Sequence, residues 1–230
     1  MESQSLGVPD LDTQADDAPQ LQSDLARIKQ AYVNEKVAPE ILEYDEELVD
    51  RLRQRLADQE DKVQGLDAHW SVELERSMYQ LELERLRYLL ASYIRTRLKK
   101  VQLYAMLCLE EASPGEDGAA PTHPRLSRQE MQFVQEFFMD MGMHMKENIL
   151  KNLPPGFDQL VRQSNADPTK DTMPAPDLDR HVFCRVLEDR GTVELDQQGL
   201  ETANFEAGDL YVVRYKAVQD LLKDKWISLT

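Results

Sequence analysis

The chain has 230 residues, with 43 acidic and 27 basic side chains and a formal net charge of −16. This balance disfavours a free-standing binder of duplex nucleic acid, because Lys and Arg side chains supply the affinity for a polyanion. The two cysteines, Cys108 and Cys184, are far apart, which is typical of a reducing compartment, and both thiols are predicted to be buried. We find no signal peptide and no apolar run long enough to span a membrane, so we expect a nuclear or cytoplasmic protein.

The first 20 residues contain five acidic residues, two prolines and no Lys or Arg, which predicts a disordered acidic tail over residues 1–20. Apolar and acidic residues are interspersed there in a way that fits either a short docking peptide or plain disorder. The candidate docking residues are Leu6, Val8, Asp10, Leu11 and Asp12.

A helical domain is predicted over residues 21–153, starting with a helix that carries Leu25, Ile28 and Tyr32 at helical spacing and stops before Pro39. A second helix should be capped by Asp45 and end at Gly65. Its apolar stripe consists of Leu48, Leu52, Leu56 and Val63. A long central helix follows from about Ser71 to about Leu109, roughly 60 Å in length at 1.5 Å per residue.

Gly and Pro residues over 113–125 predict a flexible loop before a fourth helix. Ser127 and Glu130 have the spacing of a capping box, and Leu126 and Met131 occupy the hydrophobic-staple positions on either side. This helix is expected to end at Leu153, before two prolines.

A Pro-rich linker over residues 154–175 should lead to a small β-rich domain over residues 176–230. Strands are predicted over 181–189, over 192–195 after a turn at Gly191, over 209–215 and over 226–229, with a short helix over 216–224. The fold class is therefore α+β. A domain of about 55 residues is marginal on its own, so we expect it to lean on other parts or partners.

The basic residues of the central helix do not form a phosphate track, because Arg85, Arg87, Arg95 and Lys99 scatter over its flanks and back. The apolar stripe of this helix is expected to be buried and includes Leu86, Leu90, Tyr93 and Tyr104. Arg97 falls inside the stripe. Either it is buried and paired with a carboxylate, with Glu35 and Glu40 as the candidates, or its head group reaches solvent along the stripe's edge.

The fourth helix has two apolar faces. Val134, Phe138, Met141 and Met145 form the predicted core face, while Met139, Met143 and Leu150 lie on the opposite side. Exposed apolar patches mark interaction sites, so we interpret the second face as a partner interface. A soft-metal site that combines these methionines with His144 is disfavoured, because helical spacing divides the methionines between two faces.

We find no nucleotide-binding, hydrolase or metalloprotease motif, and the histidines are isolated. The repeated "PDLD" at 9–12 and 176–179 is interpreted as a turn or the entry to a strand rather than a cation site. We therefore expect neither an enzyme nor a bound cofactor.

Four segments together resemble the Sld-five subunits of the GINS complex: "AYVNEKVAPEIL" at 31–42, "ELERLRYLLASYIRTRLKK" at 82–100, "PAPDLDRHVFCRV" at 174–186 and "LYVVRYKAV" at 210–218. The resemblance covers residues 25–109 and 126–222. It implies a non-catalytic, nuclear scaffold in a heterotetramer with three sister subunits. Through that complex it would join the MCM ring and a RecJ-like factor in the replicative DNA helicase.

The resemblance also implies that the helical and β domains meet sister subunits, and that the N-terminal tail docks on a replisome hub. The expected interface residues are Met139, Met143, Leu150, Phe183, Tyr211 and Trp226. Two alternatives stay open at this point. One is a homo-oligomeric coiled-coil adaptor, and the other is a single-strand DNA-binding module that uses Arg95, Lys99 and Lys100.

Overall fold

The structure, a computed structural model, describes residues 17–65, 73–112, 125–154, 174–195 and 202–230. The candidate docking residues Leu6, Val8, Asp10, Leu11 and Asp12, most of the predicted loop and most of the predicted linker lie outside these ranges. Residue contacts divide the chain into two compact units. The first comprises Met1–Ala31 and Glu47–Leu90, and the second comprises Tyr32–Glu46 and Ala91–Thr230.

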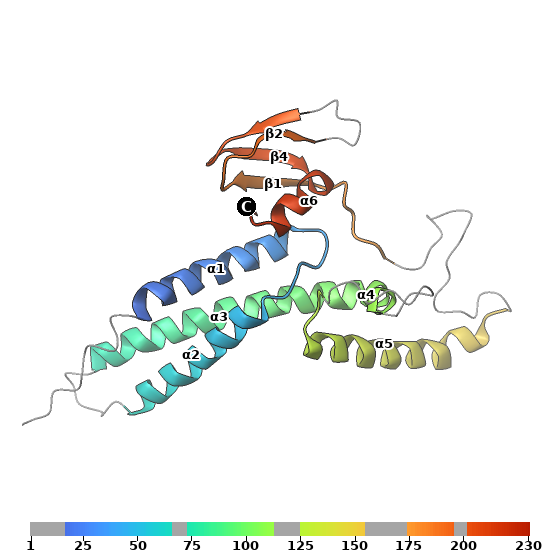
Figure 1. Ribbon diagram of the computed structural model, residues 1–230. Coiled ribbons are helices and arrows are strands. Elements are labelled where there is room, and N and C mark those ends of the chain that lie inside the picture. Colours follow the sequence, from blue (N-terminus) through green and yellow to red (C-terminus); the bar gives the residue numbers. More distant parts are fainter. Residues whose placement is uncertain (1–16, 66–72, 113–124, 155–173, 196–201) are drawn as a thin grey trace, which may run out of the picture. The chain divides into compact units, whose positions relative to one another are not determined.

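The described part of the first unit is helical (Figure 1). It contains most of α1 (Asp17–Val37), nearly all of α2 (Glu46–Gly65) and the first half of α3 (Glu73–Leu103). Each helix contributes apolar side chains that water does not reach, and burial of this kind is the main favourable term in folding. The buried residues are Ile28, Leu48, Val49, Leu52, Leu56, Val63, Leu83, Leu86 and Leu90.

The α1 helix begins at Asp17, inside the segment predicted to be disordered. Tertiary contacts stabilise its N-terminal half: the buried Asp24 carboxylate forms ion pairs with Arg51 and Arg55 of α2. Composition alone does not reveal such contacts. The start of α2 after Asp45 and its end at Gly65 agree with the prediction.

The predicted single central helix is interrupted at Tyr104 and continues as α4 (Ala105–Ala112), three residues beyond the expected end at Leu109. Helical hydrogen bonding persists across the interruption. The Tyr104 N–H donates to the Lys100 carbonyl over 2.8 Å, and the Cys108 N–H donates to the Tyr104 carbonyl over 3.0 Å.

The predicted fourth helix is α5 (Arg128–Asn148), followed by the short 3-10 helix η2 (Leu150–Asn152), so the α-helix ends before the expected Leu153. Its capping box is present. The Glu130 N–H donates to Ser127 Oγ over 3.2 Å, and the Ser127 N–H donates to the Glu130 carboxylate over 2.9 Å.

Residues 174–195 and 202–230 form what we call the β module. Its main sheet is antiparallel, with β1 (His181–Val186) between β4 (Leu210–Arg214) and β5 (Ile227–Leu229). A second sheet pairs β2 (Gly191–Glu194) with β3 (Thr202–Phe205), a strand that the sequence patterns did not predict. The helix α6 (Tyr215–Lys223) lies against the main sheet (Figure 1). In the segment 176–179, the Asp179 N–H donates to the Asp177 carboxylate, which confirms the predicted turn there.

Within the second unit, the β module shares its core with the segment that follows α1. Ala38 is buried in the same apolar cluster as Val182, Phe205 and Leu229. In addition, the Leu229 N–H donates to the Asn34 side chain over 2.9 Å. The expectation that the small module leans on another part of the chain is met by these contacts.

Candidate functional site

Arg97 of α3 is fully buried, and every one of its five N–H groups has an acceptor. Nε and Nη2 bond both oxygens of the Glu130 carboxylate, at 2.8 Å and 3.1 Å. Nη1 bonds Glu35 at 3.0 Å and the carbonyl of Leu42 at 2.8 Å. The remaining Nη2 bond goes to the carbonyl of Arg125 at 2.9 Å. One guanidinium therefore joins α1, the segment after it, α3 and the start of α5.

The rings of Tyr44 and Tyr93 stack on each other beside this guanidinium, with centroids 6.4 Å apart. The Arg97 carbon Cζ lies 5.2 Å and 5.7 Å from the two ring centroids. Cation–π attraction at these distances adds to the hydrogen bonds.

Two further cations complete a balanced group of three basic and three acidic side chains. Lys100 Nζ donates to Glu35 at 3.0 Å and to the Glu40 carbonyl at 2.7 Å. Arg125 donates to the buried Glu40 carboxylate at 2.8 Å. We call Glu35, Glu40, Arg97, Lys100, Arg125 and Glu130 the charge network. Burial of this many charges is tolerated only because each has a partner of opposite sign.

The charge network reaches the β module through Glu40. Its Oε1 accepts hydrogen bonds from the Tyr215 hydroxyl and from the Gln219 amide, both at 2.7 Å. Tyr215 is itself fully buried at the start of α6. The β module and the helices of the second unit are thus tied together by polar contacts that have defined geometry, in addition to apolar packing.

Burial and ion pairing shift the pKa values of groups in and beside the charge network. Burial alone would lower the pKa of Arg97, but its hydrogen bond to Glu130 and the charge of Glu35 outweigh that effect, so the pKa is raised. Burial lowers the pKa of Lys100, opposed by Glu35. Burial raises the pKa of Tyr93 to about 12, opposed by Arg97. Burial and the Glu40 hydrogen bond raise the pKa of Tyr215.

The prediction that Arg97 is buried and paired is confirmed for Glu35, and the alternative in which it reaches solvent is wrong. Glu40 was the wrong second candidate, because its carboxylate is occupied by Arg125, Tyr215 and Gln219. The second carboxylate paired with Arg97 is that of Glu130. The capping box had already placed this glutamate at a helix start, but nothing in its local sequence signalled a long-range partner.

The expected buried stripe of α3 is confirmed for Leu86, Leu90 and Tyr93, while Tyr104 is half-buried and packs on the edge of a core cluster. On α5, Val134 is buried as predicted. Phe133 and Phe137 pack against that cluster, and the predicted core residues Phe138, Met141 and Met145 are only half-buried.

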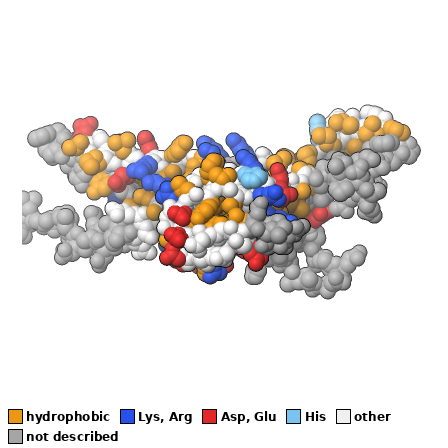
Figure 2. All heavy atoms as spheres, turned by 90° about the horizontal axis from the view of Figure 1, so that it is seen from above, with side chains coloured by type: hydrophobic (Ala, Val, Ile, Leu, Met, Phe, Trp, Pro, Cys, Tyr) orange, Lys and Arg blue, Asp and Glu red, His pale blue; other side chains and the backbone are white. Residues whose placement is uncertain are grey.

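The second apolar face of α5 lies open. Met139 is 66% exposed and Met143 is 55% exposed, while Leu150 is half-buried in η2. Figure 2 shows hydrophobic side chains uncovered on the surface among acidic and basic ones.

The other expected interface residues belong to the β module. Phe183 on β1 is exposed and pairs across the strands with the exposed Val212 of β4. Tyr211 is half-buried, stacks on Phe205 and donates to the Asn204 carbonyl over 2.6 Å. Trp226 is half-buried beneath the Arg190 guanidinium. Of these three, Phe183 is the one that the module itself leaves uncovered.

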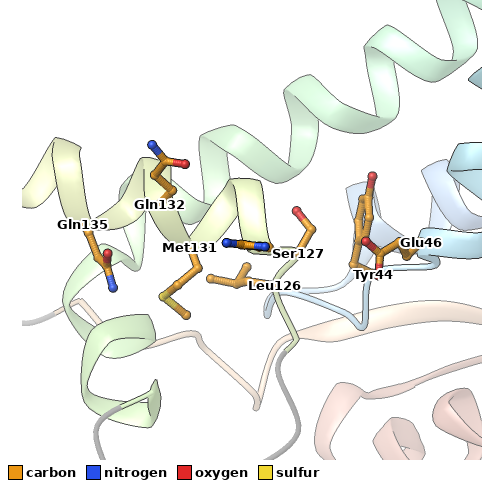
Figure 3. A pocket seen from close by; sticks show the side chains of 8 residues that line it. Tyr44, Glu46, Leu126, Ser127, Met131, Gln132 and Gln135 are labelled. Atoms are coloured by element: carbon orange, nitrogen blue, oxygen red, sulfur yellow. The ribbon is translucent and has the colours of Figure 1, made fainter.

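An open pocket of about 530 Å³ lies beside the start of α5 (Figure 3). It is lined by Tyr44, Glu46, Leu126, Ser127, Arg128, Met131, Gln132 and Gln135. At this helix start, the capping box uses the N–H groups of Ser127 and Glu130. In the described part of the chain, no three His, Cys, Asp or Glu side chains are grouped so that they could hold a metal ion.

The basic residues considered for single-strand binding do not share one environment. Arg95 and Lys99 are exposed, whereas Lys100 is engaged by Glu35 and Glu40 in the charge network. Among the helices that the structure describes, none is both long and apolar enough to cross a membrane.

Comparison with known proteins identifies both parts of the chain. A model of the GINS complex protein helical bundle domain matches residues 44–149. A model of the C-terminus of the DNA replication complex GINS protein SLD5 matches residues 176–229.

Curated relatives match over nearly the whole length. The chain is 35% identical to "DNA replication complex GINS protein SLD5" of Arabidopsis thaliana, covering 90% of this chain and 91% of the relative. The protein of the same name in Homo sapiens is 32% identical, with 89% and 88% covered. The one in Schizosaccharomyces pombe is 28% identical, with 91% and 93% covered. The chain therefore belongs to the SLD5 family of GINS complex subunits, which function in DNA replication.

Proposed function

We propose that this chain is a non-catalytic scaffold subunit of the GINS heterotetramer. In this role it holds three sister subunits in register and, through the complex, helps to join the MCM ring and a RecJ-like factor into the active replicative helicase in the nucleus. The N-terminal tail is proposed as a contact for a replisome hub.

The observation that carries the proposal is the contrast between a fully paired interior and uncovered apolar surface. In the second unit, the buried cation Arg97 has all its donors bonded, which fixes the relative positions of α1, α3 and α5. The same unit leaves Met139, Met143 and Phe183 more than half exposed. A rigid support that displays apolar side chains suits protein–protein contact.

We propose that the α5 face made of Met139, Met143 and Leu150 contacts one sister subunit. The Phe183 region of the β module, together with Tyr211 and Trp226, is proposed to contact another. Methionine supports this role, because its flexible, polarizable side chain adapts to irregular apolar surfaces.

Expression alone and together with the three sister subunits tests the proposal. We expect the four chains together to give a soluble particle with one copy of each, and the chain alone to form no homo-oligomer of defined size. A chain that is a stable monomer or homo-oligomer on its own, and that does not enter a particle with the others, would overturn the scaffold role.

A further inference from the structure

A second apolar stripe runs along the first half of α3, on the side opposite its buried residues. Leu74, Met78, Leu81 and Tyr88 are each between 61% and 75% exposed. Arg85 is also exposed and falls at the remaining position of the same spacing. We call these five residues the α3 seam.

The spacing of the seam is that of a coiled coil. Its members are separated by four, three, four and three residues, so at 100° per residue they stay within about 80° of one another. Leu83, Leu86 and Leu90, which are buried, point to the other side of the helix. The seam is therefore not a misplaced part of the first unit's core. It is a separate face of α3.

The described part of the seam is short and ends within α3. From Leu74 to Tyr88 it spans about 21 Å of helix, or two heptads. The next positions at the same spacing are Ser92, Arg95 and Lys99, which are polar. A coiled-coil contact of two heptads is weak on its own.

The charged residues in and beside the seam restrict the kind of helix that could pack on it. The described flanking positions carry Glu82 on one side and Ser77 and Glu84 on the other, all exposed. Arg85 makes no ion pair with any described residue and projects from the seam itself. Flanking charges select coiled-coil partners, and a polar residue in the seam sets the register.

A second copy of this chain is a poor partner for the seam. Parallel pairing of two seams would set Arg85 against Arg85, and antiparallel pairing would bring the acidic flanks of both helices together. The net charge of −16 adds further repulsion between copies.

We propose that the α3 seam binds an amphipathic helix of a different polypeptide, with apolar residues at three- and four-residue spacing, Lys or Arg on its flanks and a carboxylate opposite Arg85. This inference rests on the proposed assembly function and adds to it a second contact surface, separate from the α5 face, together with the charge of the partner that this surface accepts.

Photo-crosslinking in the intact complex tests the seam directly. Benzoylphenylalanine replaces Tyr88 in the full-length chain, the complex is purified from cells, and the crosslinked peptide is identified by mass spectrometry. The same probe at Gln80, an exposed position off the seam, is the control. We expect Tyr88, and not Gln80, to capture one helix with the stated pattern. Equal capture at both positions, or capture of a second copy of this chain, would overturn the inference.

A charge placed in the seam provides a second readout. Leu81→Asp is expected to weaken incorporation into the complex at least tenfold. Gln80→Asp adds the same charge at the neighbouring position, which is off the seam, and is expected to leave incorporation unchanged. Circular dichroism should show equal helix content for both variants, because both positions are exposed. If the unmodified chain enters no complex, the proposed function fails. If it enters one and both variants enter equally well, only the seam inference fails.

Discussion

Arg97 shows how this protein keeps a charge in its interior. Its cation is completely removed from water, yet two carboxylates, two carbonyls and two aromatic rings surround it. This complete pairing is what allows the charge to be buried, because an unpaired buried cation would be strongly destabilising.

Removal of the Arg97 cation should therefore be costly. Arg97→Met leaves Glu35 and Glu130 buried with fewer partners, and we expect the free energy of unfolding to fall by about 3–5 kcal/mol. Arg95→Met, on an exposed position of the same helix, is the control and should change it by no more than about 0.5 kcal/mol. Urea unfolding followed by circular dichroism measures both. A similar small loss in the two variants would contradict the account of the network.

The cysteines give a prediction about pH. Burial disfavours the thiolate and raises the pKa of Cys108 to about 11, and burial likewise raises the pKa of Cys184. A raised thiol pKa means less thiolate at pH 8, so both cysteines should react far more slowly with iodoacetamide in the folded chain than after denaturation. The reaction should accelerate as pH approaches 11. Fast labelling of either thiol at pH 8 under native conditions would be inconsistent with this burial.

Residue patterns predicted the Arg97–Glu35 pair of the charge network but not the Arg97–Glu130 pair. Arg97 was identifiable because it interrupts an apolar stripe, and Glu35 because it lies near the end of the first helix. Glu130 escaped because its capping role already explained it, although one carboxylate serves both Ser127 and Arg97. Long-range pairing of this kind depends on tertiary structure, which local spacing does not encode.

At the scale of elements, the start of α5 is where local and tertiary interactions meet. The Ser127 hydroxyl satisfies a backbone donor of the first turn and helps to hold Glu130 in place for Arg97. Helix ends that carry a capping residue or a glycine, such as the start of α5 and both ends of α2, were predicted well. The missed strand β3 has no strong alternation and is defined by its pairing with β2.

Loss of this cap should have a moderate effect. We expect Ser127→Ala to lower the free energy of unfolding by about 1 kcal/mol, since a Glu130 N–H loses its acceptor. Ser23→Ala, at an exposed interior position of α1, serves as the comparison and should be neutral or slightly stabilising. Thermal melting of the two variants distinguishes these outcomes, and equal melting temperatures would argue against the capping role.

At the scale of the whole molecule, the chain buries its charges and displays part of its apolar surface. Met139 and Met143 on α5, Phe183 on β1 and the seam on α3 are each exposed by more than half. The sequence predicted the α5 face because two apolar faces on one helix are visible in its spacing. The α3 seam was not predicted, because charged and polar residues separate its apolar positions along the sequence.

A charge on the open face of α5 should weaken assembly without unfolding the chain. We expect Met143→Asp to reduce incorporation into the complex by tenfold or more, because a carboxylate would be buried against an apolar partner surface. His144→Asp places the same charge on a different side of α5 and is expected to have little effect. Pull-down of the sister subunits, with circular dichroism as a check on helix content, measures the difference. Unchanged incorporation of Met143→Asp would remove α5 from the interface.

The scaffold role itself is tested most directly by native mass spectrometry of the tagged full-length chain, recovered from extracts of its own cells. We predict a particle that contains this chain and three different subunits, in one copy each. A lone monomer, or a particle built only from copies of this chain, would contradict the scaffold role.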